Sequence, residues 1–155
     1  MSLLIVSLVA VSLWSFIKIN LLNSSFEKQT SELKTIYENE INSLSVEQLT
    51  TTSKVFAWAV RSELLRNNKE QVNLFFERII KEPGINKVQF VDSKTSKILL
   101  STNKKDEGAV YPNQVALMTD ETIHFSSDAT QSFISPVMGL NNKLGVLVIE
   151  YQRNK

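Results

Sequence analysis

The chain of 155 residues has no cysteine, one histidine and almost no net charge. Without cysteine it cannot form a disulfide framework, a thiolate zinc site or a cysteine nucleophile. The single histidine, His124, rules out metal sites that need several imidazoles. Seventeen Lys and Arg against sixteen Asp and Glu give a formal charge of +1, so no overall field favours nucleic acid. The composition favours a binding or structural module over an enzyme, with no cofactor and no metal expected.

Charged side chains are also missing from residues 1–17, and Lys18 is the first one. The apolar character continues to Leu22, and a helix over residues 1–22 is about 33 Å long at ~1.5 Å per residue. This length matches a hydrocarbon core of roughly 30 Å. The sequence therefore predicts a single-pass transmembrane anchor over residues 1–22, in contact with the lipid bilayer. The alternatives are a cleaved signal peptide and a buried soluble helix, although no basic side chain precedes the run and no good cleavage site follows it.

Two signals predict opposite orientations for this anchor. Lys18, Lys28 and Lys34 follow the span and no basic side chain precedes it, which favours a cytoplasmic domain. The family resemblance described below implies the opposite orientation, with the domain outside the cytoplasm.

Residues 23–49 are predicted to form a helical stalk. Between Leu21 and Asn67 the sequence contains neither proline nor glycine, and helix-forming residues dominate. A narrow apolar stripe at three-to-four spacing is predicted to contact another helix, either of a partner protein or of a second copy: Leu33, Tyr37, Ile41 and Leu44. Ser45 and Gln48 resemble a capping box, so either a new helix begins at Ser45 or one long helix bends there.

Residues 50–155 are predicted to form a globular domain. After the apolar helix around 55–65, Asn67 and Asn68 indicate a stop and a new N-cap, and a second amphipathic helix ends before Pro83–Gly84. The periodicity then changes to that of strands, and a short helix is expected over 112–118. The predicted strands are 85–92, 97–101, 121–126, 131–138 and 143–151. Helices first and antiparallel strands afterwards predict an α+β fold with a five-stranded sheet packed by helices.

Several phrases of this domain, taken in order, resemble the Cache family of extracytoplasmic sensor domains, which share a PAS-like five-stranded sheet. The phrases are Glu82–Pro83–Gly84–Ile85, Phe90–Val91–Asp92, Ile98–Leu99–Leu100–Ser101, Phe133–Ile134–Ser135–Pro136–Val137 and Leu144–Gly145–Val146–Leu147–Val148–Ile149. The resemblance covers roughly Thr50 to Tyr151, and the order of anchor, long helix and domain also matches. It implies an inner-membrane protein whose globular domain lies in the periplasm or outside the cell.

Two departures from the family pattern shape the functional expectation. The chain ends at Lys155, where Cache sensors usually continue into a second membrane helix and an output domain. Carboxylate-binding members place Arg or His in the strand that here reads Leu99–Thr102, so an organic-acid ligand is not expected. The polar strand residues Gln89, His124 and Ser132 are the candidates for contacting any other small molecule. Gly145 is expected to let the last strand, central in such a fold, pack closely against the long helix.

Two functions follow from these observations. The first is an accessory or protein-interaction subunit of a membrane complex in the cell envelope, whose partner is an integral membrane or periplasmic protein. The alternative is a small-molecule sensor that signals through a separate partner protein, with a pocket between the sheet and residues 103–118. An enzyme is not expected, because no nucleophile–base pair, metal constellation or phosphate-binding loop can be assembled from the sequence.

Overall fold

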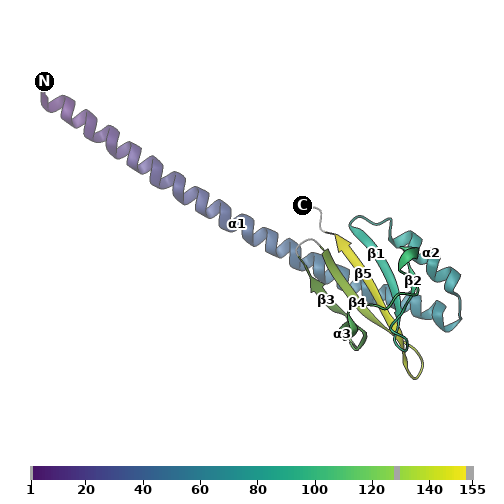
Figure 1. Ribbon diagram of the computed structural model, residues 1–155. Coiled ribbons are helices and arrows are strands. Elements are labelled where there is room, and N and C mark those ends of the chain that lie inside the picture. The colour runs from purple at the N-terminus through teal and green to yellow at the C-terminus, as the bar shows by residue number, and fades with distance from the viewer. Residues whose placement is uncertain (1, 128–129, 153–155) are drawn as a thin grey trace. The chain divides into compact units, whose positions relative to one another are not determined.

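The computed structural model describes the backbone of residues 2–127 and 130–152, and within these ranges the side chains of residues 14, 31–37, 39–127 and 130–152. The chain divides into two units, Met1–Ser45 and Val46–Lys155, and helix α1 (Ser2–Leu65) contributes to both (Figure 1). The hydroxyl of Ser45 donates to the carbonyl of Ile41 at 2.8 Å. This is a bond of the helix interior, so Ser45 does not start a new helix.

The transmembrane anchor predicted for residues 1–22 lies, apart from Trp14, outside the residues whose side chains are described. Among the described residues, no helix has the length and apolar character needed to cross a membrane. The anchor therefore stays a prediction.

The helix boundaries predicted around Asn67 and Pro83 are confirmed. Asn67 takes a positive φ of 56° after α1, and the Asn68 side chain accepts a hydrogen bond from the Gln71 N–H at 3.2 Å, capping α2 (Lys69–Ile79). Gly84 follows with a φ of +83°, and a Cβ there would overlap the ring of Tyr151. Glycine is therefore required where the chain turns into the sheet.

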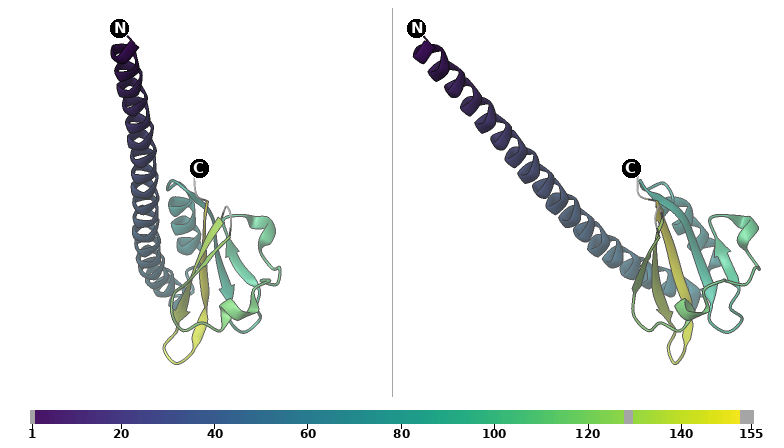
Figure 2. Two further views of the ribbon diagram at one scale, coloured as in Figure 1. Left: turned by 90° about the vertical axis from the view of Figure 1, so that its left-hand side faces the viewer. Right: turned by 60° about the vertical axis from the view of Figure 1, so that its left-hand side comes forward.

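The predicted five-stranded antiparallel sheet is confirmed. Its strands are β1 (Ile85–Asp92), β2 (Ile98–Ser101), β3 (Ile123–Ser126), β4 (Thr130–Met138) and β5 (Lys143–Gln152). They lie in the order β2-β1-β5-β4-β3, so β5 is central, as expected (Figure 2). Between β2 and β3 run a 3-10 turn (Lys104–Asp106) and the short helix α3 (Gln114–Leu117). The fold of Val46–Lys155 is therefore α+β.

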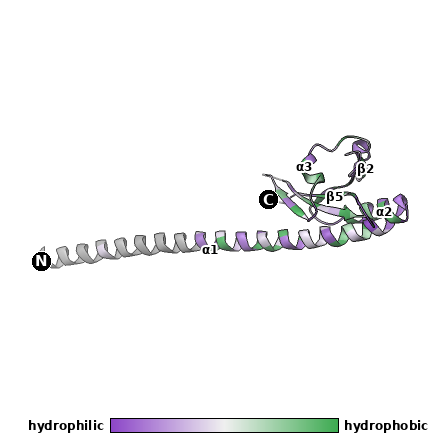
Figure 3. Cartoon of the chain, turned by 90° about the horizontal axis from the view of Figure 1, so that it is seen from below, coloured by the Kyte–Doolittle hydropathy of each residue, from purple (hydrophilic) through white to green (hydrophobic). Residues whose placement is uncertain are grey.

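The two faces of the sheet carry separate apolar cores. On one face, Phe90, Phe133 and Leu147 pack with Val60 of α1 and Phe76 of α2. On the other face, residues of β1, β4 and β5 pack under the segment that contains α3 (Figure 3). This second core consists of Val91, Ile98, Tyr111, Ala116, Leu117, Ile134, Val146 and Val148. The alternation of Val88 and Phe90 with Gln89 and Val91 follows from the period of two residues along β1.

Gly145 does not pack against the long helix, and that expectation was wrong. A Cβ at this position would overlap the carbonyl oxygen of Val91 and the ring of Phe90, both on β1. Gly145 pairs with Asp92 of β1 on one side and with Val137 of β4 on the other. The close approach is thus made within the sheet, where the side chain of Phe90 lies over the backbone of β5.

Candidate functional site

The apolar stripe predicted on the stalk is exposed in the first unit. Leu33, Tyr37, Ile41 and Leu44 on α1 have exposed fractions of 53%, 61%, 61% and 54%. Large apolar side chains at this spacing, with more than half of their surface in water, are typical of a helix that binds another surface. The structure thus places the four predicted interface residues where a partner could reach them.

Within Val46–Lys155, α1 has an inner and an outer face. Val46, Leu49, Ala57 and Val60 pack into the core, whereas Val55 and Trp58 have exposed fractions of 53% and 62%. A hollow of about 340 Å³ lies beside Val55, and the described residues that line it are Thr51, Thr52, Val55, Phe56 and Ala59. The ring of Phe56 also packs on the core.

Gln89, a predicted ligand contact, belongs to a buried polar network. Its side chain is 3% exposed, and its Nε2 donates to Oδ2 of Asp106 at 2.9 Å. The ammonium of Lys87 lies 3.5 Å from the same Asp106 oxygen and 3.6 Å from Oε1 of Glu150. Burial, and next to it the negative charge of Glu150, raise the pKa of Tyr111 above 10.0. Gln89 is therefore held by the protein's own groups.

This network lines a hollow between the sheet and the 105–112 segment, the region where the sequence predicts a pocket. Its volume is about 300 Å³, near the lower limit of small-molecule sites. The neighbouring space over the centre of the sheet is filled, because Tyr111, Ala116 and Leu117 pack there on Val146 and Val148. A ligand on this face is therefore restricted to the polar hollow at β1.

The three predicted ligand residues do not converge on one site. Ser132 pairs with Glu150 across the β4–β5 ladder and lies on the face of Gln89, but the central strand β5 separates the two. His124 is on the opposite face, with its ring stacked on Phe133 at a centroid distance of 4.7 Å. Its Nε2 is buried and has no hydrogen-bond partner within the described part of the chain.

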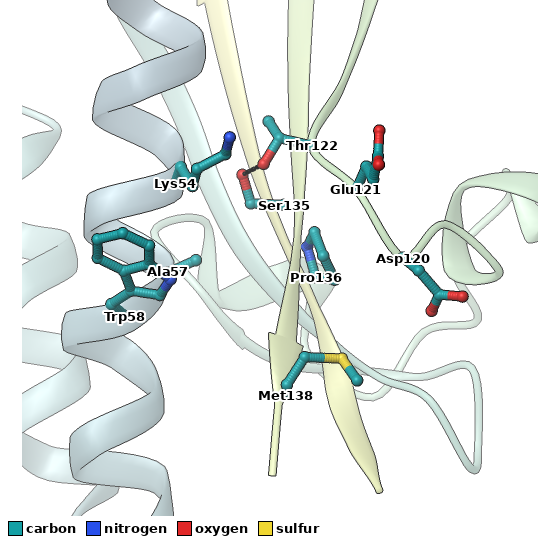
Figure 4. Close-up of a pocket in the computed structure, with 9 residues that line it drawn as sticks. All are labelled: Lys54, Ala57, Trp58, Asp120, Glu121, Thr122, Ser135, Pro136 and Met138. Atoms are coloured by element: carbon teal, nitrogen blue, oxygen red, sulfur yellow. Dashed lines mark hydrogen bonds between the residues drawn. The ribbon is translucent and has the colours of Figure 1, made fainter.

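A third hollow, which the sequence does not indicate, lies between α1 and β4. Its volume is about 390 Å³, and Figure 4 shows Lys54 pointing toward Thr122 and Ser135, with Asp120 and Glu121 on the segment before β3. The lining residues are Lys54, Ala57, Trp58, Asp120, Glu121, Thr122, Ser135, Pro136 and Met138. They come from three separate segments, so no local sequence pattern marks the hollow.

Hydroxyl groups and one ammonium fix the walls of this third hollow. Ser135 Oγ lies 2.8 Å from Ser53 Oγ on α1 and 2.9 Å from Thr122 Oγ1. The Nζ of Lys143 donates to the carbonyl of Leu117 at 2.8 Å and also to that of Thr119, which ties the 117–121 segment to β5. Burial lowers the pKa of Lys143, and the charge of Asp120 opposes this shift.

Comparison with known proteins gives no family assignment. No protein-family model matches the sequence, and no curated protein matches it. Among the residues whose side chains the structure describes, no group of three or more His, Asp or Glu is placed to hold a metal ion.

Proposed function

We propose that this chain is a membrane-anchored subunit whose long helix binds another protein in an envelope complex. Residues 1–22 insert into the inner membrane, residues 23–49 form the stalk, and a Cache-like domain over 50–155 lies in the periplasm or outside the cell. The observation that carries the proposal is the exposure of Leu33, Tyr37, Ile41 and Leu44 on α1.

Burial of the exposed stripe in an interface would supply part of the free energy of association. Complete burial of one such side chain stabilises by about 1.5–3 kcal/mol, and roughly half of that remains to be gained at each position, so the four together supply about 4 kcal/mol. Association costs at least about 4 kcal/mol in lost translational and rotational freedom. The stripe alone is therefore marginal, and a partner must also contact further surface, in the membrane or on the domain.

The proposed family membership rests on the sequence phrases at Glu82–Ile85 and Phe133–Val137. The five-stranded antiparallel sheet is compatible with it. Sheets of this kind with helices on their faces also occur in unrelated proteins, so the fold supports the family proposal without being specific to it.

The test is extraction of the tagged full chain from its native membranes in a mild detergent, followed by mass spectrometry of the proteins that co-purify. We expect a partner at near-stoichiometric amount that is lost when Ile41→Glu and Leu44→Glu are combined. Ser43→Glu is the matched control, because Ser43 is exposed on the same helix but off the stripe. Recovery of the chain in the soluble fraction would contradict the anchor. A partner retained by the double variant would contradict the stripe as the binding surface.

The second candidate function is a small-molecule sensor, and the polar hollow at β1 is the observation that favours it. Lys87, Asp106 and Glu150 place charges of both signs around about 300 Å³. A ligand that binds only the folded chain raises the free energy of unfolding by about 2.7 kcal/mol at 100 times its Kd. The Tm rises as a consequence. A metabolite screen by thermal shift tests this function, and a true ligand raises the Tm of the natural chain but not that of Lys87→Met.

A further inference from the structure

The edge strand β3 pairs on one side only. It is the last strand in the order β2-β1-β5-β4-β3, and β4 is its neighbour (Figure 1). The N–H of Ser127 donates to the carbonyl of Thr130 at 2.9 Å. In an antiparallel ladder, residues that exchange hydrogen bonds alternate with residues that do not. Phe125, two residues earlier, therefore also bonds to β4, whereas His124 and Ser126 turn their backbone N–H and C=O groups outward.

These four outward groups have no hydrogen-bond partner among the residues that the structure describes. The opposite edge differs, because the segment that follows β2 covers it. The N–H of Ile98 donates to the Ala109 carbonyl at 2.9 Å, and its carbonyl accepts from the Gly108 N–H at 2.8 Å. The Ser101 N–H donates to Oε1 of Glu107 at 2.9 Å. The chain thus closes one edge of the sheet itself and leaves the edge at β3 open.

The open edge also lacks several features that keep edge strands from pairing. Natural proteins protect such edges with charged side chains, proline or a bulge. Residues 122–127 contain neither lysine, proline nor an acidic residue, and no register shift interrupts the pairing of β3 with β4. Phe125 has an exposed fraction of 42% on this edge. Strand-forming residues around an exposed aromatic ring are typical of an edge that receives another strand.

A second copy of this chain does not fit the edge. Two identical edges close only as an antiparallel pair, and its two-fold axis is perpendicular to the sheet. Because α1 packs on one face of the sheet through Ala57 and Val60, this axis reverses the direction of the 46–65 segment in the second copy. The proposed function requires both chains to enter the same membrane. The occupant of the edge is therefore a segment of a different protein.

We propose that an extended segment of the partner protein pairs with β3 and adds a sixth strand to the sheet. Its backbone bonds the outward groups of His124 and Ser126, and a large apolar side chain of the segment covers Phe125. Glu121, just before β3, is exposed and has no ion pair within the described residues, which favours a basic residue at that end of the segment. The inference rests on the proposed function, since it assigns the further contact surface that the exposed stripe needs.

Photo-crosslinking in native membranes tests this pairing in the tagged full chain. Phe125 is replaced by p-benzoylphenylalanine, and mass spectrometry maps the adduct. Ser126→Pro removes an outward N–H that has no bond in the described fold, so the edge tolerates it, whereas the matched control Ser126→Ala keeps that N–H. We expect an adduct to one segment of the partner with Ser126→Ala, and about tenfold less of it with Ser126→Pro.

Amide hydrogen exchange gives a second readout that needs no substitution and decides the question if Ser126→Pro lowers the Tm. In the full chain purified without its partner, the amides of His124 and Ser126 should exchange rapidly. The amide of Phe125 should exchange slowly, because it bonds to β4. In the complex extracted with mild detergent, we expect all three amides to be protected.

The other outcomes are distinguishable. An adduct to a second copy of this chain refutes a different protein as the occupant. Equal adducts from Ser126→Pro and Ser126→Ala at unchanged Tm, or unprotected amides of His124 and Ser126 in the complex, refute strand pairing. A partner that co-purifies and depends on Ile41 and Leu44 but gives no adduct refutes the edge and leaves the proposed function standing. An adduct that persists when Ile41→Glu and Leu44→Glu are combined supports the edge and contradicts the stripe as the binding surface.

Discussion

Removal of the Ser135 hydroxyl should destabilise the domain more than removal of the hydroxyl that it bonds on α1. Ser53 and Ser135 are buried, with exposed fractions of 0% and 1%, and their Oγ atoms are 2.8 Å apart. In Ser53→Ala, Ser135 keeps its bond to Thr122, so one hydrogen bond is lost at a cost of about 1 kcal/mol. In Ser135→Ala, the Ser53 hydroxyl loses its partner where water cannot reach it, and the expected cost is about 2–3 kcal/mol.

The double variant separates this reasoning from a general effect of alanine. When both hydroxyls are removed, no member of the buried pair is left without a partner, and the cost should fall to about 1–2 kcal/mol. The two single substitutions are therefore expected to be coupled by about 2 kcal/mol. Unfolding of the full chain in urea, followed by pulse proteolysis of the globular domain, measures all three free energies of unfolding.

Two results would refute the argument. A cost below about 0.5 kcal/mol for Ser135→Ala would mean that Ser53 finds another acceptor, such as a carbonyl of its own helix. Additivity of the two substitutions within about 0.5 kcal/mol would mean that the hydroxyls do not act as a pair. The same experiment also reports on how α1 is held over the sheet, because this bond joins α1 to β4.

Three further predictions concern the sheet and its margins. Gly145→Ala should lower the free energy of unfolding by about 2–3 kcal/mol, seen as a drop in Tm, because its Cβ would overlap the Val91 carbonyl oxygen. An unchanged Tm in Gly145→Ala would contradict the close approach. For Glu107, burial raises the pKa, but hydrogen bonds from Lys104 and the Ser101 N–H and the charge of Lys104 together hold the pKa below 4.5. This carboxylate therefore stabilises the fold above pH 4.5 and loses that contribution as the pH falls through the folded-state pKa, so Glu107→Gln should flatten the decline in Tm between about pH 5 and pH 2. Because the pKa of Tyr111 is raised in the folded state, its contribution to the free energy of unfolding is fully present below pH 10.0 and is lost as the pH rises through the folded-state pKa. At alkaline pH, Tyr111→Phe should therefore unfold at a higher urea concentration than the natural chain.

The strand and helix boundaries could be predicted because their signals are local. The alternation from Ile85 to Asp92 sets a period of two residues, and the prediction of this strand is confirmed at both ends. Asn68 caps α2 through a bond to a residue three positions away, so its role is visible in the sequence. The stripe from Leu33 to Leu44 was predicted as a surface for the same reason, since its spacing alone places it on one side of a helix.

The sequence by itself determined the α+β order, the approximate bounds of the strands and the apolar stripe of the stalk, because these depend on periodicity within each segment. Only the tertiary structure decided that Gln89 meets Asp106, that His124 lies on the other face from Gln89 and Ser132, and that Gly145 contacts β1 rather than the helix. The physical reason is that strand register and loop position join residues far apart along the chain. A shift of one residue in one ladder would reverse which side chains share a face.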